Sequence, residues 1–160
     1  MKIKIFLAIL LLSIMAACDS EGITYEPPPS SNTIPKIIIK ASNNMYIALN
    51  SDSVLVANQP DSTKAEEFEK IGIENGKCAL KSSTGKFVSD DRSKNNKLIA
   101  IGPYIGEWEL FEIIKVNEVT VNFKSSTGKF VCVDLYKGGI LLSNQNEAKE
   151  WETFTIKPVN

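Results

Sequence analysis

An eight-residue segment occurs twice in this 160-residue chain and limits the folds that the chain can adopt. Residues 81–88 and 124–131 both read Lys-Ser-Ser-Thr-Gly-Lys-Phe-Val, and the two segments begin 43 residues apart. Other positions keep the same interval: Leu55, Leu98 and Leu141; Phe68, Phe111 and Phe154; Trp108 and Trp151. A period of this length is typical of proteins built from copies of one supersecondary unit.

Each copy has the pattern of four short β-strands. An alternating apolar stretch (78–81 and 119–124) leads into Ser-Ser-Thr-Gly, whose glycine suits the left-handed position of a tight hairpin turn. After Phe-Val and a polar loop, we predict a third strand around Leu98 or Leu141. The fourth strand is predicted from Trp108 to Lys115 and from Trp151 to Lys157.

A first copy is recognisable although its sequence has diverged. Residues 39–46 align with the two Ser-Ser-Thr-Gly segments, and the loop that follows them is two residues shorter. Segment 62–70 contains Ala and Glu and has a local helical tendency. Its Phe68 is nevertheless in register with the two strand phenylalanines, so we predict a strand there.

Three copies of four strands predict an all-β fold with twelve strands. Blades of a β-propeller have about the same length, but a propeller needs about four to eight of them. We therefore predict a β-trefoil of three pseudo-repeats of about 43 residues. Four positions from each copy make up the predicted core: Ile39, Tyr46, Leu55, Phe68; Leu80, Phe87, Leu98, Phe111; Phe123, Phe130, Leu141, Phe154.

The repeated pattern also resembles one subgroup of β-trefoils. An apolar strand, the Ser-Ser-Thr-Gly-Lys-Phe-Val hairpin, a leucine-containing strand and a closing Glu-Trp-Glu-x-Phe-x-Ile are similar to the fascin-like domains, over residues 36–160. The resemblance implies a fold more than a function. Eukaryotic fascins crosslink actin with four trefoils per chain, and a single trefoil lacks that multivalency. We therefore do not carry actin crosslinking over.

The N-terminus has the features of an export signal. Lys2 and Lys4 precede an apolar run that is too short for a transmembrane helix of about 20 apolar residues. Met15-Ala16-Ala17-Cys18 then resembles the lipobox of bacterial lipoproteins. The resemblance implies a signal peptide at residues 1–17 and lipid attachment at Cys18. The alternative is an ordinary secretory signal followed by an unrelated cysteine.

The implied product is a bacterial membrane lipoprotein. Asp19 and Glu21 follow the cysteine, and acidic residues there resemble an inner-membrane retention signal in some bacteria and a surface-export signal in Bacteroidota. We expect a Bacteroidota-type lipoprotein that is anchored in the outer membrane and exposed on the cell surface. Residues 18–35 contain Pro27-Pro28-Pro29 and predict an extended tether of roughly 50 Å.

Composition excludes several classes of function. The chain has no histidine, which removes imidazole bases, Cys-His and Ser-His pairs and histidine-containing zinc sites. With no nucleophile motif and no metal cluster, we expect neither an enzyme nor a bound cofactor or metal. A near-neutral charge of −1 argues against nucleic acid as a partner. We expect a monomer.

Two loops contain residues suited to binding a sugar. Asp91 and Asp134 occupy the same position in their copies, and Tyr104 and Tyr136 lie further along the same copies. Ricin-type lectins, another trefoil subgroup, place an aspartate after the second strand and an aromatic side chain in a later loop. Their Gln-x-Trp motif is replaced here by Glu-Trp.

The chemistry of such a site suits a carbohydrate. Carboxylates accept hydrogen bonds from sugar hydroxyls, and an aromatic face covers the apolar side of a pyranose. We therefore predict a non-catalytic module that binds a glycan. The alternatives are a protein-binding adhesin or inhibitor, and, for each aspartate, an ordinary solvated loop residue.

Two further pairs of residues have a structural interpretation. The repetition of Trp108 and Trp151 at a strand start favours a role in capping each unit over sugar stacking. Cys78 and Cys132 share the strand phase of the predicted core and lack a disulfide-framework spacing, which favours buried free thiols.

Overall fold

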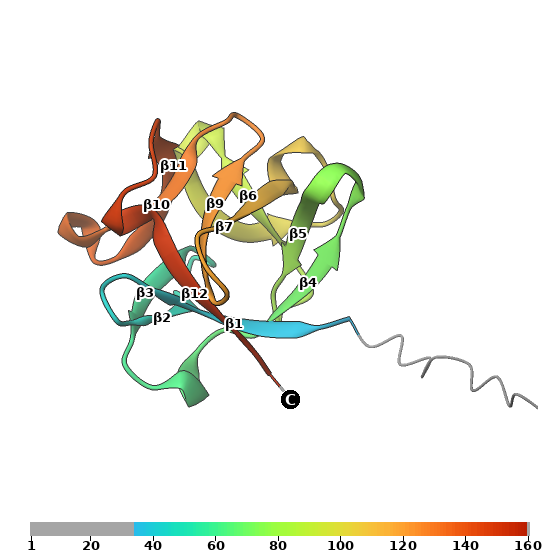
Figure 1. The fold of residues 1–160 in the computed structure, drawn as a ribbon. Helices are drawn as coiled ribbons and strands as arrows, with labels where there is room; N and C mark the ends of the chain where they lie inside the picture. Colours follow the sequence, from blue (N-terminus) through green and yellow to red (C-terminus); the bar gives the residue numbers. More distant parts are fainter. Residues whose placement is uncertain (1–33, 160) are drawn as a thin grey trace, which may run out of the picture. The chain divides into compact units, whose positions relative to one another are not determined.

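The computed structural model describes residues 34–159, which form twelve β-strands in three repeats (Figure 1). Both the predicted all-β class and the strand number are confirmed. Repeat one (36–72) contains β1 (Lys36–Ala41), β2 (Tyr46–Leu49), β3 (Leu55–Gln59) and β4 (Phe68–Gly72). Repeat two (77–115) contains β5 (Lys77–Lys81), β6 (Phe87–Asp91), β7 (Lys97–Gly102) and β8 (Phe111–Lys115). Repeat three (120–158) contains β9 (Thr120–Ser125), β10 (Phe130–Asp134), β11 (Ile140–Gln145) and β12 (Thr153–Pro158).

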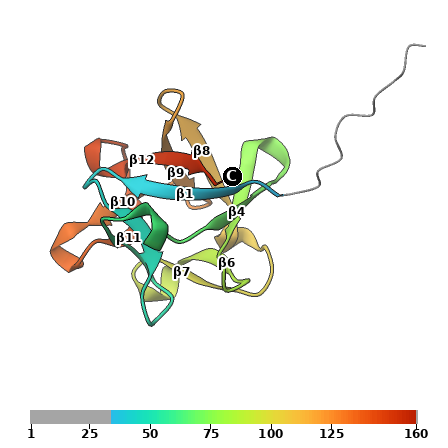
Figure 2. The ribbon, with the colours of Figure 1, turned by 90° about the horizontal axis from the view of Figure 1, so that it is seen from below.

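Six of the strands close into a barrel. The first and last strands of the three repeats pair antiparallel around a ring, in the order β1, β12, β9, β8, β5, β4 and back to β1. Figure 2 shows β12 lying beside β1, so both ends of the domain belong to the barrel wall. The six remaining strands form the hairpins β2–β3, β6–β7 and β10–β11, which contact one another through β3, β7 and β11. This arrangement is a β-trefoil.

The Ser-Ser-Thr-Gly turn has the predicted conformation. Gly85 and Gly128 have φ angles of 79° and 78°, and their amides donate to the carbonyls of Ser82 and Ser125 at 2.9 Å. In repeat one, Asn44 occupies the same place with φ 64°, and its amide donates to the Ala41 carbonyl at 3.0 Å. Asparagine tolerates the left-handed region better than most residues, so the diverged first copy keeps the turn.

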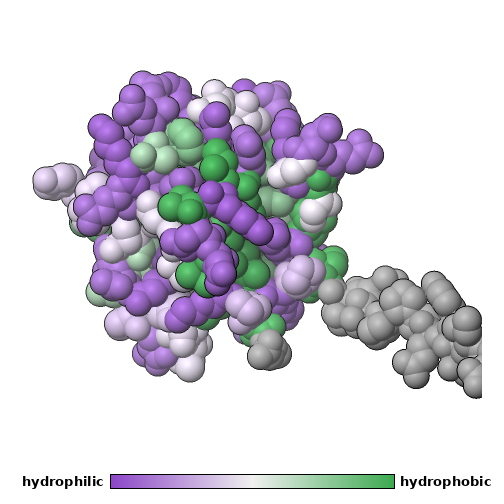
Figure 3. All heavy atoms as spheres, in the orientation of Figure 1, coloured by the Kyte–Doolittle hydropathy of each residue, from purple (hydrophilic) through white to green (hydrophobic). Residues whose placement is uncertain are grey.

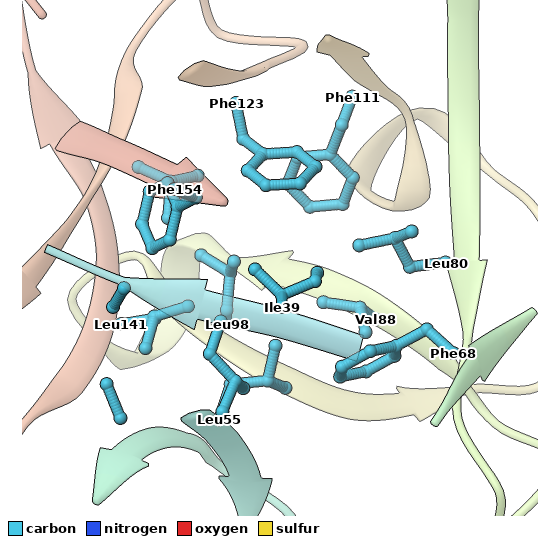
Figure 4. Close-up of a cluster of buried hydrophobic side chains, with 14 of the residues drawn as sticks. Ile39, Leu55, Phe68, Leu80, Val88, Leu98, Phe111, Phe123, Leu141 and Phe154 are labelled. Atoms are coloured by element: carbon cyan, nitrogen blue, oxygen red, sulfur yellow. The ribbon is translucent and has the colours of Figure 1, made fainter. Parts of the chain in front are cut away.

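The core lies inside the barrel and beneath the hairpins. Phe68, Phe111 and Phe154, one from each repeat, are buried, and the ring centroids of Phe123 and Phe154 lie 5.5 Å apart, edge to face. Figure 4 shows these side chains converging with Leu55, Leu98 and Leu141 from the hairpins. Burial of each such side chain contributes roughly 1.5–3 kcal/mol to folding.

One layer of the predicted core was wrong. Tyr46, Phe87 and Phe130 do not belong to the central cluster; the residues that follow them, Ile47, Val88 and Val131, do. Neighbouring side chains of a strand point to opposite faces, so the prediction selected the wrong face of β2, β6 and β10. A β-bulge lies opposite this position on the partner strand: Phe87 pairs with Gly102, but Val88 pairs with Ala100, and the same shift occurs in the other repeats.

The start of the fourth strand was also predicted wrongly in two repeats. Strands β8 and β12 begin at Phe111 and Thr153, and the two tryptophans lie in the short 3₁₀ helices η4 (Glu107–Glu109) and η6 (Glu150–Glu152) that precede them. The reason is local: the side chains of Glu109 and Glu152 reach back to the backbone amides at the start of each turn. The segment with helical tendency in repeat one is a single 3₁₀ turn, η1 (Ser62–Lys64), followed by β4.

Most of the visible surface in Figure 3 is hydrophilic, with hydrophobic side chains gathered near its centre and right side. The predicted signal peptide (1–17), Cys18 and most of the predicted tether (18–35) lie outside the described residues. Pro35 at the end of that tether already contacts the domain, because its carbonyl accepts a hydrogen bond from the Lys70 amide at 3.0 Å. No helix within residues 34–159 is long and apolar enough to cross a membrane.

Candidate functional site: a pocket in repeat three

A pocket of about 860 Å³ opens in repeat three. The strands β10 and β11 supply one side of it, and the 3₁₀ helices η5 (Leu135–Lys137) and η6, with the loop between β11 and η6, supply the rest. Two of the four residues that the sequence indicated, Asp134 and Tyr136, line this pocket together with Trp151. Its size is within the range of small-molecule sites.

The Asp134 loop is held by local hydrogen bonds. Asp134 caps η5 by accepting from the Lys137 amide at 3.2 Å, and its second carboxylate oxygen lies 3.2 Å from the Lys137 ammonium. The loop closes at Gly138 and Gly139, both left-handed, and the Gly139 carbonyl accepts from the Ala57 amide of repeat one at 2.8 Å. Tyr136, at the tip of this loop, is fully exposed.

The β-bulge supplies the polar wall of the pocket. Residue Asn144 is the extra residue between the pairs Phe130–Gln145 and Val131–Ser143, and it lines the pocket beside Gln145. The Asn144 side-chain oxygen accepts from the Gln145 amide at 2.8 Å and from the Cys132 thiol at 3.4 Å. Bulges commonly re-aim a side chain at sites of function. Here the bulge directs hydrogen-bonding groups at the space in front of β11.

Trp151 supplies the aromatic side of the pocket. It lies in η6 and is 41% exposed. The adjacent Glu152 fixes the turn, since its Oε2 accepts from the Lys149 amide at 2.8 Å and its backbone carbonyl accepts from the Asn122 side chain at 2.9 Å. The capping role that we predicted for the tryptophan is therefore performed by its neighbour, and part of the indole remains accessible.

Repeat two differs from repeat three in the side chain that lies against its tryptophan. The guanidinium of Arg92 lies 5.5 Å from the ring centroid of Trp108, and its Nη2 donates to Glu107 and to Ser126, each at 3.0 Å. Leu135 occupies the position of Arg92 in repeat three, and no cation lies over the Trp151 ring among the described residues. Trp108 is also 41% exposed, so the two tryptophans differ in the cation beside the ring and not in their exposed fraction.

The other two predicted site residues lie in repeat two and are not joined by a hydrogen bond in the described part of the chain. Asp91 is buried and caps η3 (Arg92–Lys94), where its Oδ1 accepts from the Ser93 amide at 3.0 Å and its Oδ2 lies 3.8 Å from the Lys94 ammonium. Tyr104 is 72% exposed. The Asp91 carboxylate therefore serves its own loop.

Sequence reasoning missed the polar run that distinguishes repeat three. Residues 144–147 read Asn-Gln-Asn-Glu, whereas the same positions of repeat two read Ile-Gly-Pro-Tyr. All four polar residues line the pocket. An alignment of the two repeats position by position contains this signal, since amide and carboxylate side chains replace Ile-Gly-Pro-Tyr at four consecutive positions.

The two cysteines are buried free thiols, as predicted. Burial raises the pKa of the Cys78 thiol to about 11 and raises that of Cys132, against a smaller lowering by the Gln145 side chain. Both thiols are therefore protonated at neutral pH and weak nucleophiles. Within residues 34–159, no three Cys, Asp or Glu side chains gather in a way that could hold a metal ion.

No protein-family model matches the chain, and no curated protein matches its sequence. Solved structures do match. The designed threefold-symmetric protein ThreeFoil superposes with a TM-score of 0.66 and 9% identity, over 76% of this chain and 96% of ThreeFoil. A Polyporus squamosus lectin, solved with the epitope Neu5Acα2-6Galβ1-4GlcNAc, superposes with a TM-score of 0.65 and 17% identity, over 77% of this chain and 48% of the lectin.

An endo-β-galactosidase of Clostridium perfringens that releases GlcNAcα1-4Gal gives a TM-score of 0.63 and 12% identity. This match covers 79% of our chain and 33% of the galactosidase, so the chain spans less than half of both the lectin and the galactosidase. Identities this low establish the fold alone. Together with the threefold pairing of the strands, they show that residues 34–159 fold as a β-trefoil.

Proposed function

We propose that the protein binds a carbohydrate through the repeat-three pocket and does not catalyse a reaction there. The observation that carries this proposal is the accessible Trp151 ring, which shares one pocket with the Asp134 carboxylate and the Asn144 amide. An aromatic face contacts the C–H groups of a pyranose, while carboxylates and amides bond to its hydroxyls. A pocket with one exposed aromatic side chain and a row of hydrogen-bonding groups therefore suits a sugar ring.

Two of the similar structures support the same class of ligand. The lectin was solved with a bound glycan epitope, and the galactosidase releases a disaccharide. The proposed ligand of this chain is accordingly a glycan. We also propose that the domain belongs to the fascin-like subgroup on the strength of its Ser-Ser-Thr-Gly-Lys-Phe-Val hairpins.

The proposal includes the place of the domain in the cell. We propose a monomer anchored to a bacterial outer membrane through lipidated Cys18 and facing away from the cytoplasm, which rests on the lipobox resemblance at Met15-Ala16-Ala17-Cys18. Two or more acyl chains anchor a protein stably. Cys18→Ser should move the protein out of the membrane fraction or block its processing, and unchanged fractionation and processing would contradict the anchor.

A glycan array probed with the full-length chain tests the binding proposal. Trp151→Ala should abolish the signals of the wild type because it removes the stacking face. The matched control is Trp108→Ala, which removes the same residue from repeat two, where Arg92 already covers the ring. Equal signals for the wild type and Trp151→Ala would rule out this pocket as the glycan site.

A protein ligand is the second candidate. The fully exposed Tyr136 and the exposed Leu135 stand side by side at the rim of the pocket, and tyrosine is enriched at the centres of protein interfaces. A blank array together with a captured protein partner that is lost on Tyr136→Ala would favour this candidate. A glycan site should show instead weak, hydroxyl-specific binding.

A further inference from the structure

The inner wall of the repeat-three pocket contains a carboxylate oxygen that the protein itself does not use. Glu152 lines the pocket and is only 6% exposed. Its Oε2 accepts from the Lys149 amide at 2.8 Å, and no hydrogen bond to its Oε1 is found in the described part of the chain. Among the described residues, the fully buried side-chain oxygens without a partner belong to Ser42 and Asp90, so the Glu152 Oε1 is an acceptor that the pocket leaves accessible.

Repeat two shows how the same oxygen is satisfied within the protein. Glu109 is the equivalent residue, and its Oε2 accepts from the Gly106 amide at 2.9 Å, as in repeat three. Its Oε1, however, accepts a hydrogen bond from the Ser89 hydroxyl. The repeat-three counterpart of Ser89 is Cys132, whose thiol donates to Asn144 instead.

A second replacement separates the two repeats. Gly102 packs against the glutamate in repeat two, where a Cβ at this position would lie 2.9 Å from the Oε1 of Glu109. Repeat three has Gln145 at that position, and its amide points to Asn144. The serine donor and the glycine that accommodate the glutamate are therefore both absent from repeat three. Both replacements leave Glu152 facing the pocket.

We infer that Glu152 is a ligand-binding residue, and that its Oε1 accepts a hydrogen bond from a hydroxyl or amino group of a glycan without acidic groups at that position. The inference rests on the proposed function and adds the charge of the glycan group that contacts Glu152. A buried carboxylate repels an anionic group placed against it, whereas it bonds strongly to a hydroxyl or an ammonium.

The cations around the pocket do not reverse this preference. The Lys149 ammonium lies 3.8 Å from Glu147, and the Lys137 ammonium lies 3.2 Å from Asp134. Both lysines are more than half exposed, so solvent and salt screen them. Each is also beside a carboxylate and offers no uncompensated charge to an acidic sugar. A third ammonium, that of Lys129, donates to the side-chain oxygen of the pocket residue Asn146. The preference therefore applies to the sugar group that contacts Glu152, which is neutral or carries an amino group.

Two variants that preserve the turn test the inference. In Glu152→Gln one amide oxygen can still accept from Lys149, because glutamine replaces glutamate in capping boxes, but an NH₂ donor then faces the pocket. We expect glycan binding at least about tenfold weaker, the lower end for a hydrogen bond to a charged group. Glu109→Gln makes the same change in repeat two and should leave binding unchanged.

The ligand class is tested on an array of neutral, amino and acidic glycans that includes Galβ1-4GlcNAc and Neu5Acα2-6Galβ1-4GlcNAc. The full-length wild type should bind glycans of the first two classes, and the added sialic acid should not increase binding. Preference for acidic glycans, or equal affinity for the wild type and Glu152→Gln, would overturn the inference. If Trp151→Ala still abolished binding in that case, the proposed function would stand. A blank array would overturn both.

Discussion

At the scale of single residues, Asp90 is an acidic group placed in the hydrophobic interior. It is 0% exposed, and its positions in the other repeats are Leu49 and Val133. Neither carboxylate oxygen has a hydrogen-bond partner in the described residues, and the nearby Ser143 hydroxyl donates to Ser125 at 2.7 Å. Burial raises the pKa of Asp90 more than the hydroxyls of Ser125 and Ser143 lower it. Folding therefore shifts the equilibrium of Asp90 toward its neutral form.

This predicts stability that falls with rising pH. Because the pKa is higher in the folded state, the folded protein holds the proton more tightly, and the contribution is fully present below the unfolded pKa of about 3.9. This contribution to stability is lost as pH rises through the folded pKa of Asp90. Asp90→Asn should remove the pH dependence that Asp90 causes and raise the free energy of unfolding at neutral pH by about 1–3 kcal/mol. Urea unfolding at a series of pH values measures the free energy of unfolding and its pH dependence.

Asp61→Asn is the control for this measurement. The backbone amide and hydroxyl of Thr63 lower the pKa of Asp61, so that carboxylate contributes stability above its unfolded pKa and loses it as pH falls. Asp61→Asn should therefore reduce the loss of stability at low pH, whereas Asp90→Asn should reduce the loss of stability at higher pH. An Asp90→Asn variant with the pH profile of the wild type would contradict the prediction.

At the scale of elements, the hairpins of repeats two and three differ mainly in what covers the tryptophan. Both have the same bulge and the same Glu-Trp-Glu turn. In repeat two, Arg92 follows β6 and bonds to η4 and to Ser126 of repeat three, which holds its guanidinium over Trp108. Trp108 and Trp151 are both 41% exposed, so the elements that precede them decide whether a cation lies against the ring.

Removal of this arginine should expose Trp108. We expect Arg92→Ala in a Trp151→Phe background, where Trp108 is the remaining tryptophan, to increase quenching of the fluorescence by acrylamide. Loss of the cation–π contact should also lower the free energy of unfolding by about 0.5–1 kcal/mol. The control is Lys94→Ala, which removes an exposed cation from the same loop. Equal quenching in the variant and the control would contradict the role of Arg92.

At the scale of the whole molecule, the three repeats share one core, and we expect them to unfold together. The barrel is closed by β1 and β12, which pair over five positions although they lie at opposite ends of the domain. Phe68, Phe111 and Phe154 are each buried in the same cluster. Each repeat therefore completes the hydrophobic environment of the other two.

A change in repeat one should consequently affect the repeats that contain the tryptophans. Phe68→Ala should lower the free energy of unfolding by about 3–5 kcal/mol, because it leaves a cavity in the shared core. Trp108 and Trp151 report on repeats two and three, and their fluorescence should lose its native signal in the same single transition. Phe111→Ala and Phe154→Ala should have similar effects. Separate transitions, or an unchanged tryptophan signal in Phe68→Ala, would show that the repeats are independent.

The sequence by itself determined the architecture. Local rules place a left-handed residue at Gly85 and Gly128, and the 43-residue period assigns Leu98 and Phe111 to the same environments as Leu141 and Phe154. These features depend on turn geometry and hydrophobic pattern, which are properties of short segments. The same reasoning selected Asp134 and Tyr136, which both line the pocket, although it gave them no preference over Asp91 and Tyr104.

Only the tertiary structure decided which side chains face the core and which face a ligand. Val88 and Val131, and not Phe87 and Phe130, face the core, because the register of a strand against its partner decides which of its two faces points inward. The pocket depends on contacts between distant residues. Ser89 satisfies Glu109, twenty positions away, whereas Glu152 meets no such donor, and this difference arises where the hairpin packs against the following turn.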